Sequence, residues 1–156
     1  MLYNSDKTMG TAESCTGGRI AEAIISVPGA SNYFKGGIVS YTNEVKERLL
    51  GVSHEVLEEQ TAVCEEVARE MVVGAIKALD VDFAISATGV AGPTGGTKEI
   101  PVGTIYIGYG NKDDVRVEKL TEDYGRDINL AIATNTALKG MHEFLKEHAD
   151  DLKKEA

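Results

Sequence analysis

The sequence predicts an α/β fold: a single domain with a layered α/β/α arrangement around a mixed sheet of about five strands. Three observations lead to this prediction. Segments with helical and with strand-like apolar spacing alternate along the chain. The 17 glycines, against 3 prolines, indicate many tight turns between these segments. The length of 156 residues suits one domain, so we assign residues 1–156 to it and expect 149–156 to be a fraying tail.

The first half of the chain predicts two strand-to-helix units. An extended stretch ends near Glu13, and a helix follows the glycine pair at 17–18. Residues 36–41 form the next strand, after which Asn43 caps a short helix over 44–50. The apolar face of the first helix carries Ile20, Ala21, Ile24 and Ile25.

The second half predicts a core helix, a strand, a hairpin and a closing helix. Residues 65–79 repeat apolar side chains in a stripe wide enough to be buried. Residues 81–88 form a strand, and a glycine- and proline-rich loop without regular structure follows it. Residues 104–110 and 115–121 pair as an antiparallel hairpin, and 127–147 form a helix that covers one sheet face. The apolar positions of that helix are Ile128, Ile132, Leu138, Met141 and Leu145.

Charge and composition exclude several function classes. A formal net charge of −9 repels polyanions, so we expect no nucleic-acid partner. No apolar run approaches the roughly 20 residues that span a bilayer, and the N-terminus lacks the plan of a signal peptide, so we expect no membrane association. Two cysteines without Cys-x-x-Cys spacing suit a reducing compartment and predict a cytoplasmic protein. Small α/β proteins often associate, so we expect a homo-oligomer, a dimer or higher.

Three loops that follow predicted strands are candidates for a ligand pocket. They comprise residues 14–18, 41–46 and 88–97. In open α/β sheets the loops at the carboxyl ends of the strands form the ligand crevice. The sequence therefore predicts one pocket in which these three loops meet.

The first loop offers two adjacent nucleophiles, Ser14 and Cys15. A serine or threonine before a helix usually caps it, which is the structural alternative for Ser14 and Thr16. The glycines Gly17 and Gly18 favour a functional reading, because they let backbone N–H groups approach a ligand and form an anion-binding nest. Free cysteines are mostly small buried residues, and the three histidines lie in segments expected to be exposed, so we rank Cys15 below Ser14.

A nucleophilic serine needs a base, and Lys46 is the remaining candidate. Its ammonium would have to lose a proton through burial or a neighbouring positive charge. Tyr41, at the end of the preceding strand, could relay or position that proton. On the sequence alone a lysine here is more often a solvated residue paired with Glu44 or Glu47, and a tyrosine an ordinary sheet-edge aromatic, so these alternatives stay open.

The glycine-rich loop fits no nucleotide-binding fingerprint. Gly89-x-x-Gly92-x-x-Gly95 is neither the dinucleotide motif nor a P-loop, although its glycines suit close contact with a flat or anionic ligand. Arg126, just before the last helix, could clamp a carboxylate or phosphate, or could pair with a neighbouring aspartate. The histidines and acidic residues show no metal-ligand spacing, so we expect no metal and no cofactor.

Four segments in order carry a family resemblance: TAESCTGG, VPGASNYFKGGIVSYTNEVKERLLGV, ATGVAGPTGG and PVGTIYI. Together they resemble the CinA carboxy-terminal domain family, over nearly the whole chain from about Thr11 to the last helix. Free-standing members of that family include the nicotinamide-nucleotide amidases. Such enzymes hydrolyse the carboxamide of nicotinamide mononucleotide, without a metal, to nicotinate mononucleotide and ammonia.

The resemblance implies roles for residues of this sequence. It makes Ser14 the nucleophile, Lys46 its base and Tyr41 an active-site partner, with a small-molecule nucleotide as substrate. Thr94 and Ile100 depart from the family pattern, which usually has an aspartate and a lysine there. A pyridine-nucleotide-binding or assembly module without turnover, or an amidase for another small amide, therefore stays open. The resemblance also places Thr88 and Arg126 in the substrate pocket. Together with the residues of the predicted nest and of the glycine-rich loop, the predicted substrate-binding residues are Cys15, Thr16, Gly17, Gly18, Thr88, Gly89, Gly92 and Arg126.

Overall fold

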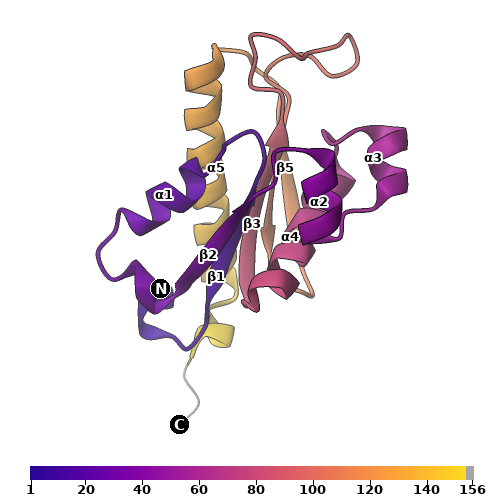
Figure 1. The fold of residues 1–156 in the computed structure, drawn as a ribbon. Helices are drawn as coiled ribbons and strands as arrows, with labels where there is room; N and C mark the ends of the chain where they lie inside the picture. Colours follow the sequence, from indigo (N-terminus) through magenta and orange to yellow (C-terminus); the bar gives the residue numbers. More distant parts are fainter. Residues whose placement is uncertain (154–156) are drawn as a thin grey trace.

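A five-stranded mixed sheet forms the centre of the computed structural model, which describes residues 1–153 (Figure 1). The strand order is β2-β1-β3-β4-β5, with β1 parallel to both of its neighbours and β4 antiparallel to β3 and β5. The mixed sheet of about five strands is therefore confirmed. The strands are β1 (Met9–Glu13), β2 (Phe34–Val39), β3 (Phe83–Gly89), β4 (Ile105–Gly110) and β5 (Val115–Leu120).

Helices cover both faces of the sheet, which confirms the layered α/β/α arrangement. In Figure 1, α1 and α5 lie on one side of the strands, and α2, α3 and α4 lie on the other. Each helical layer closes its own apolar core against the sheet. Short 3-10 turns lie at 2–4, 30–32 and 149–152, and residues 154–156 of the expected tail are outside the described part. The helices are α1 (Arg19–Ile25), α2 (Asn43–Leu50), α3 (His54–Gln60), α4 (Glu65–Leu79) and α5 (Arg126–Glu147).

The predicted apolar faces are correct except at two positions. The stripe of α4 is buried as expected, from Val67 to Ala75. The prediction that Ile25 and Ile128 are buried is wrong, because their exposed fractions are 58% and 55%. Successive helical residues turn by about 100°, so Ile128 lies roughly opposite the buried Leu130, and Ile25 lies to one side of the buried Ile24.

Two local predictions in the α2–α3 region need correction. The cap of α2 is Thr42, whose extended backbone lets its side chain accept a hydrogen bond from Val45 N at 3.2 Å, whereas Asn43 is already helical. The sequence also did not predict α3. This helix has only seven residues with one buried side chain, Leu57, and therefore shows no apolar stripe.

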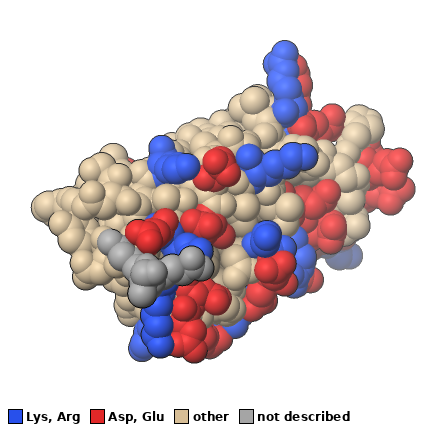
Figure 2. Space-filling view, turned by 90° about the horizontal axis from the view of Figure 1, so that it is seen from below, with Lys and Arg blue, Asp and Glu red and all other residues tan. Residues whose placement is uncertain are grey.

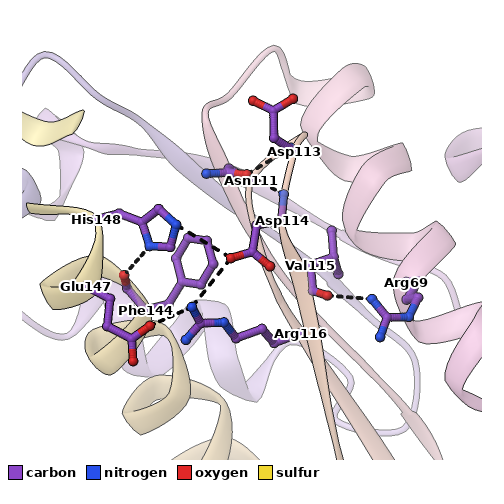
Figure 3. A network of polar contacts seen from close by, with 9 residues as sticks. All are labelled: Arg69, Asn111, Asp113, Asp114, Val115, Arg116, Phe144, Glu147 and His148. Carbon is purple, nitrogen blue, oxygen red and sulfur yellow. Dashed lines mark hydrogen bonds and ion pairs between the residues drawn. The ribbon is translucent and has the colours of Figure 1, made fainter. Parts of the chain in front are cut away.

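A polar network fastens the end of α5 to the hairpin of β4 and β5 (Figure 3). Arg116 pairs with Glu147 at 2.6 Å and with Asp114 at 3.4 Å, and its guanidinium lies over the Phe144 ring. The imidazole of His148 stacks on the same ring, with 4.0 Å between the ring centroids. These contacts hold the last turn of the helix against the sheet.

The end of the molecule that is lowest in Figure 1 carries interspersed charges of both signs (Figure 2). A cavity of about 830 Å³ lies there, lined largely by aspartate and lysine side chains. Among residues 1–153 no group of histidine, cysteine and carboxylate side chains is arranged to hold a metal ion. No helix in this part of the chain is both long and apolar enough to cross a membrane.

Candidate functional site

A cavity of about 380 Å³ lies at the carboxyl edge of the parallel strands. Its walls come from the loops after β1, β2 and β3 and from the start of α5, so the three predicted loops do meet. The loop between α3 and α4 adds Ala62 and Val63, which no sequence signal indicated. Of the predicted site residues, those that line the cavity are Ser14, Cys15, Tyr41, Lys46, Thr88, Gly89, Gly92 and Arg126.

The hydroxyl of Ser14 and the amine of Lys46 are in direct contact inside this cavity. Lys46 Nζ lies 2.9 Å from Ser14 Oγ and 2.9 Å from the carbonyl oxygen of Ser40. Lys46 is only 1% exposed. Burial lowers the pKa of Lys46 below its ordinary value of 10.5, because a desolvated ammonium is unfavourable. The geometry is that of a serine beside a potential base.

The alternative of a solvated surface lysine is wrong. Lys46 lies on the inner side of α2, one turn before the buried Leu50. The two glutamates proposed as its partners lie elsewhere on the helix surface. Glu44 pairs with Arg48, and Glu47 pairs with a histidine of α3.

Cys15 lines the cavity but is poorly suited to act as the nucleophile. Burial raises the pKa of its thiol to about 12, so the thiol stays protonated near neutral pH. No histidine lines the cavity that residues 1–153 form. The physical environment therefore favours Ser14 over Cys15.

Glu13 was missed by sequence reasoning and organises the turn that carries Ser14. Its carboxylate is 1% exposed and accepts hydrogen bonds from the Thr16 hydroxyl at 2.7 Å and from the backbone amides of Ile20 at 2.8 Å and Ala21 at 3.0 Å. An acidic residue just before a predicted helix was the available signal, since carboxylates stabilise helix N-termini.

Thr16 and the glycine pair do not line the cavity, so their role as a ligand-binding nest needs correction. The hydroxyl of Thr16 bonds Glu13, and the amide of Gly17 donates to the Ser14 carbonyl oxygen at 3.1 Å. Gly18 takes a φ of 107° and is the N-cap of α1, whose first-turn amides at Ile20 and Ala21 donate to Glu13. The glycines serve the turn because side chains disfavour such angles.

The glycine-rich loop forms the opposite wall. Thr88 is 1% exposed, and its hydroxyl donates to the carbonyl oxygen of Ala62 at 2.8 Å. A side chain at Gly89 would place its Cβ 2.6 Å from Ile105 Cα, so glycine permits the close approach of β3 and β4. Gly92 takes a φ of 86° and offers its carbonyl oxygen to Arg126.

Arg126 contacts this loop and does not pair with a neighbouring aspartate among the described residues. Its Nη1 donates to the Gly92 carbonyl oxygen at 2.7 Å. Asp127 pairs with Arg19 at 3.5 Å, and Asp123 accepts hydrogen bonds from backbone and amide groups. No described residue accepts a hydrogen bond from the other guanidinium N–H groups of Arg126, which can therefore donate to a ligand.

Asn129 joins the glycine loop to α5 and was also missed by sequence reasoning. It is 3% exposed, and its Nδ2 donates to the Ala91 carbonyl oxygen at 3.1 Å and to Asp123 Oδ1 at 2.9 Å. Its Oδ1 accepts from the amide of Tyr124 at 2.8 Å. This buried amide thereby fixes the loop that carries Gly92.

Asn129→Asp is expected to loosen this wall. The substitution places a carboxylate oxygen against Asp123 and the Ala91 carbonyl, and we expect a loss of about 3 kcal/mol in the unfolding free energy. Denaturant unfolding measures the loss, and hydrogen exchange of residues 89–103 should become faster. Thr134→Val, which removes one hydroxyl further along α5, is the control. Unchanged stability and exchange in the Asn129 variant would contradict this role.

Tyr41 lies at the mouth of the cavity and is 64% exposed. Within residues 1–153 its hydroxyl makes no hydrogen bond to Lys46 or Ser14, so the structure contains no proton relay through it. Its ring is open to a molecule that enters the cavity.

Comparison with known families identifies what the whole chain is similar to. The profile of the CinA C-terminal domain matches residues 1–145. A CinA-like protein of Leptospira borgpetersenii is 45% identical over 150 residues, which is 96% of this chain and 36% of that protein. A putative competence-damage inducible protein of Clostridium kluyveri is 44% identical over 138 residues, 88% of this chain and 34% of the relative. The chain thus spans about a third of the length of these curated relatives.

Solved structures share the fold over nearly their full length. The competence damage-inducible protein A of Klebsiella pneumoniae superposes with a TM-score of 0.88 at 30% identity, over 93% of this chain and 90% of that one. The competence/damage inducible protein CihA of Agrobacterium tumefaciens gives a TM-score of 0.84 at 37% identity, over 89% of this chain and 86% of the other.

Proposed function

Because this chain belongs to the CinA C-terminal domain family, we propose that it is an amidohydrolase that converts nicotinamide mononucleotide to nicotinate mononucleotide and ammonia. One observation carries the proposal: the buried amine of Lys46 lies 2.9 Å from the hydroxyl of Ser14 inside an open cavity. A nucleophile beside a base is the arrangement that acyl transfer requires.

Lys46 acts as the base in the proposed reaction. The structure gives Lys46 Nζ as the donor to both the Ser40 carbonyl oxygen and Ser14 Oγ. In the proposed reaction the neutral amine keeps one N–H on the Ser40 carbonyl oxygen and accepts the proton of the Ser14 hydroxyl with its lone pair. Ser14 Oγ attacks the carboxamide carbon while its proton passes to Lys46. Lys46 then passes this proton to the nitrogen of the substrate carboxamide, the C–N bond breaks, and the nitrogen leaves as ammonia. Water attacks the acyl-serine ester with Lys46 again as base, which releases the acid and restores Ser14.

The remaining cavity walls suit a nucleotide. Cys15 lines the cavity, and its backbone amide donates to no other residue among residues 1–153, so in the proposed reaction this amide stabilises the tetrahedral oxyanion. The free guanidinium N–H groups of Arg126 suit the phosphate, and the ring of Tyr41 lies open at the mouth. A volume of about 380 Å³ is within the range of small-molecule sites.

The test is an ammonia assay with purified protein and nicotinamide mononucleotide, with the nucleotide products separated by chromatography. The proposal predicts equal amounts of ammonia and nicotinate mononucleotide. Nicotinamide riboside, which lacks the phosphate, should be a poorer substrate if Arg126 contacts that group. If the protein hydrolyses another small amide faster than the mononucleotide, the substrate assignment is wrong and the assignment as an amidohydrolase stands.

A second candidate function is a pyridine-nucleotide-binding module without turnover. Thr94 favours it, since this uncharged residue lines the cavity where the family pattern usually has an aspartate. Calorimetry with nicotinamide mononucleotide separates the two candidates. Heat of binding without any ammonia would support the module, and ammonia release would exclude it.

A further inference from the structure

Two charged side chains are buried at or beside the cavity in the part of the chain that the structure describes, Lys46 and Glu13, and the carboxylate of Glu13 does not line the cavity. Its Oε1 accepts from the Thr16 hydroxyl at 2.7 Å and from the Ile20 amide at 2.8 Å. Its Oε2 accepts from the Ala21 amide at 3.0 Å and lies 3.4 Å from the Thr11 hydroxyl. Burying a carboxylate is costly unless donors surround it, and here four donors do.

These hydrogen bonds enclose the nucleophile in sequence and in space. Ser14 and Cys15 lie between Glu13, the last residue of β1, and Thr16, so the Glu13–Thr16 bond closes a short ring of chain around Ser14. The backbone of Glu13 takes part as well, because its carbonyl oxygen accepts from the Ser40 amide at 2.8 Å. Ser40 in turn presents its own carbonyl oxygen to Lys46 Nζ. Both partners of the Ser14–Lys46 contact are thus tied to Glu13.

We propose that Glu13 is a positioning residue for the reaction at Ser14, and that it acts through Thr16 and the first turn of α1. This role rests on the function proposed above and extends it. The carboxylate neither lines the cavity nor contacts Lys46, so it does not take part in the reaction directly. Its hydrogen bonds fix the turn that carries Ser14, and this keeps Ser14 Oγ where Lys46 can accept the proton of the hydroxyl. Thr16 is a positioning residue as well, because its hydroxyl donates to Glu13 and does not face the cavity.

Variants of Glu13 and Thr16 that each change one hydrogen-bond donor or acceptor test this role. Glu13→Gln turns an acceptor oxygen into an amide group that faces N–H or O–H donors. Thr16→Val removes only the hydroxyl, and Thr16→Ser keeps it. Ser86→Ala is the matched control, because the Ser86 hydroxyl is also buried, also makes a 2.7 Å hydrogen bond and lies outside the cavity.

The kinetic readout separates positioning from mere stability. At a temperature where all variants are folded, Glu13→Gln should lower kcat by about 10²-fold with KM unchanged, as a misplaced nucleophile does. Thr16→Val should lower kcat by about tenfold, in line with the loss of one hydrogen bond. Thr16→Ser should restore kcat, and Ser86→Ala should lose stability with no change in kcat.

A second readout needs no substrate. An arylsulfonyl fluoride reacts with an activated serine, and peptide mass spectrometry locates and times its attachment to Ser14. The proposal predicts slower labelling in Glu13→Gln and Thr16→Val, and labelling at the wild-type rate in Thr16→Ser. Folded variants with wild-type kcat and labelling rates would overturn it, and so would an equal loss in Ser86→Ala.

The two readouts also distinguish this inference from the proposed function. If the wild-type protein releases no ammonia but is labelled at Ser14, and labelling slows in the two variants, the substrate assignment fails and the positioning role stands. If the wild-type protein is neither labelled nor active, both proposals fail, because there is then no reactive serine to position.

Discussion

Ser14→Ala is expected to reduce ammonia release from nicotinamide mononucleotide by about a thousandfold or more, while Cys15→Ala keeps most of the turnover. The alanine variant retains the cavity and Lys46 but has no oxygen to attack the carboxamide carbon. The thiol of Cys15 cannot substitute, since burial raises its pKa to about 12 and keeps it protonated. Steady-state ammonia assays on the two purified variants measure the difference.

Binding provides the control for this pair of variants. Ser14→Ala should still bind the nucleotide, because the phosphate and ring contacts come from other walls of the cavity. Calorimetry on the inactive variant checks that its pocket is intact. Full activity in Ser14→Ala together with an inactive Cys15→Ala would reverse the assignment of the nucleophile.

Lys46→Met is expected to lower kcat/KM by about 10²- to 10⁴-fold, the usual contribution of a general base. Methionine matches the unbranched stem of lysine and suits a buried position, so the loss reports on the amine. In the wild-type protein kcat/KM should rise with pH and level off above the pKa of Lys46, because the neutral amine is the active form. That midpoint should lie below 10.5, since burial lowers this pKa.

The same lysine makes stability depend on pH with a defined sign. Its folded-state pKa lies below the ordinary 10.5, so between these two values the unfolded chain binds more protons than the folded one. The unfolding free energy therefore rises with pH across that interval, and the cost of burying the charge is fully present below it. Lys46→Met lacks this titration. The unfolding free energy of the variant minus that of the wild type should thus decrease as pH approaches 10.5.

Denaturant unfolding of both proteins at several pH values measures this difference. Lys77→Met is the control, because Lys77 is an exposed lysine in the last turn of α4. A difference that stays constant with pH would show that Lys46 titrates normally. Such a result, together with a flat pH–rate profile, would remove Lys46 as the base.

Much of the fold was predictable because it depends on local patterns. The stripe of α4 and the alternation in β4 and β5 identify these elements without tertiary information. The helix α3 was not predictable, because one buried leucine in seven residues leaves no periodic signal. The cap at Thr42 in place of Asn43 shows that neighbouring cap-forming residues are distinguished by backbone angle, which the sequence does not specify.

Some features of the candidate site were also predictable from the sequence, and others were not. The contact of Ser14 with Lys46 could be expected, because β1 and β2 are adjacent parallel strands whose carboxyl ends meet at one edge. The burial of Lys46 could not, since it depends on how α2 packs against α4. Glu13 was missed although its side-chain partners lie within eight positions, because the sequence does not specify that the chain turns back to place the start of α1 against this carboxylate. Asn129 was missed because its partner Ala91 lies 38 positions away. Such contacts carry no local signature.

Titration of the Lys46 amine itself decides whether this lysine can act as the base for Ser14. Nuclear magnetic resonance of protein with isotope-labelled lysine follows each side chain with pH, and the spectrum of Lys46→Met identifies the signal. If Lys46 is the base, its amine should lose its proton with a midpoint below pH 10.5, at the same pH at which kcat/KM reaches half its plateau. A Lys46 that remains charged up to 10.5 or beyond, in a protein active at neutral pH, would contradict it.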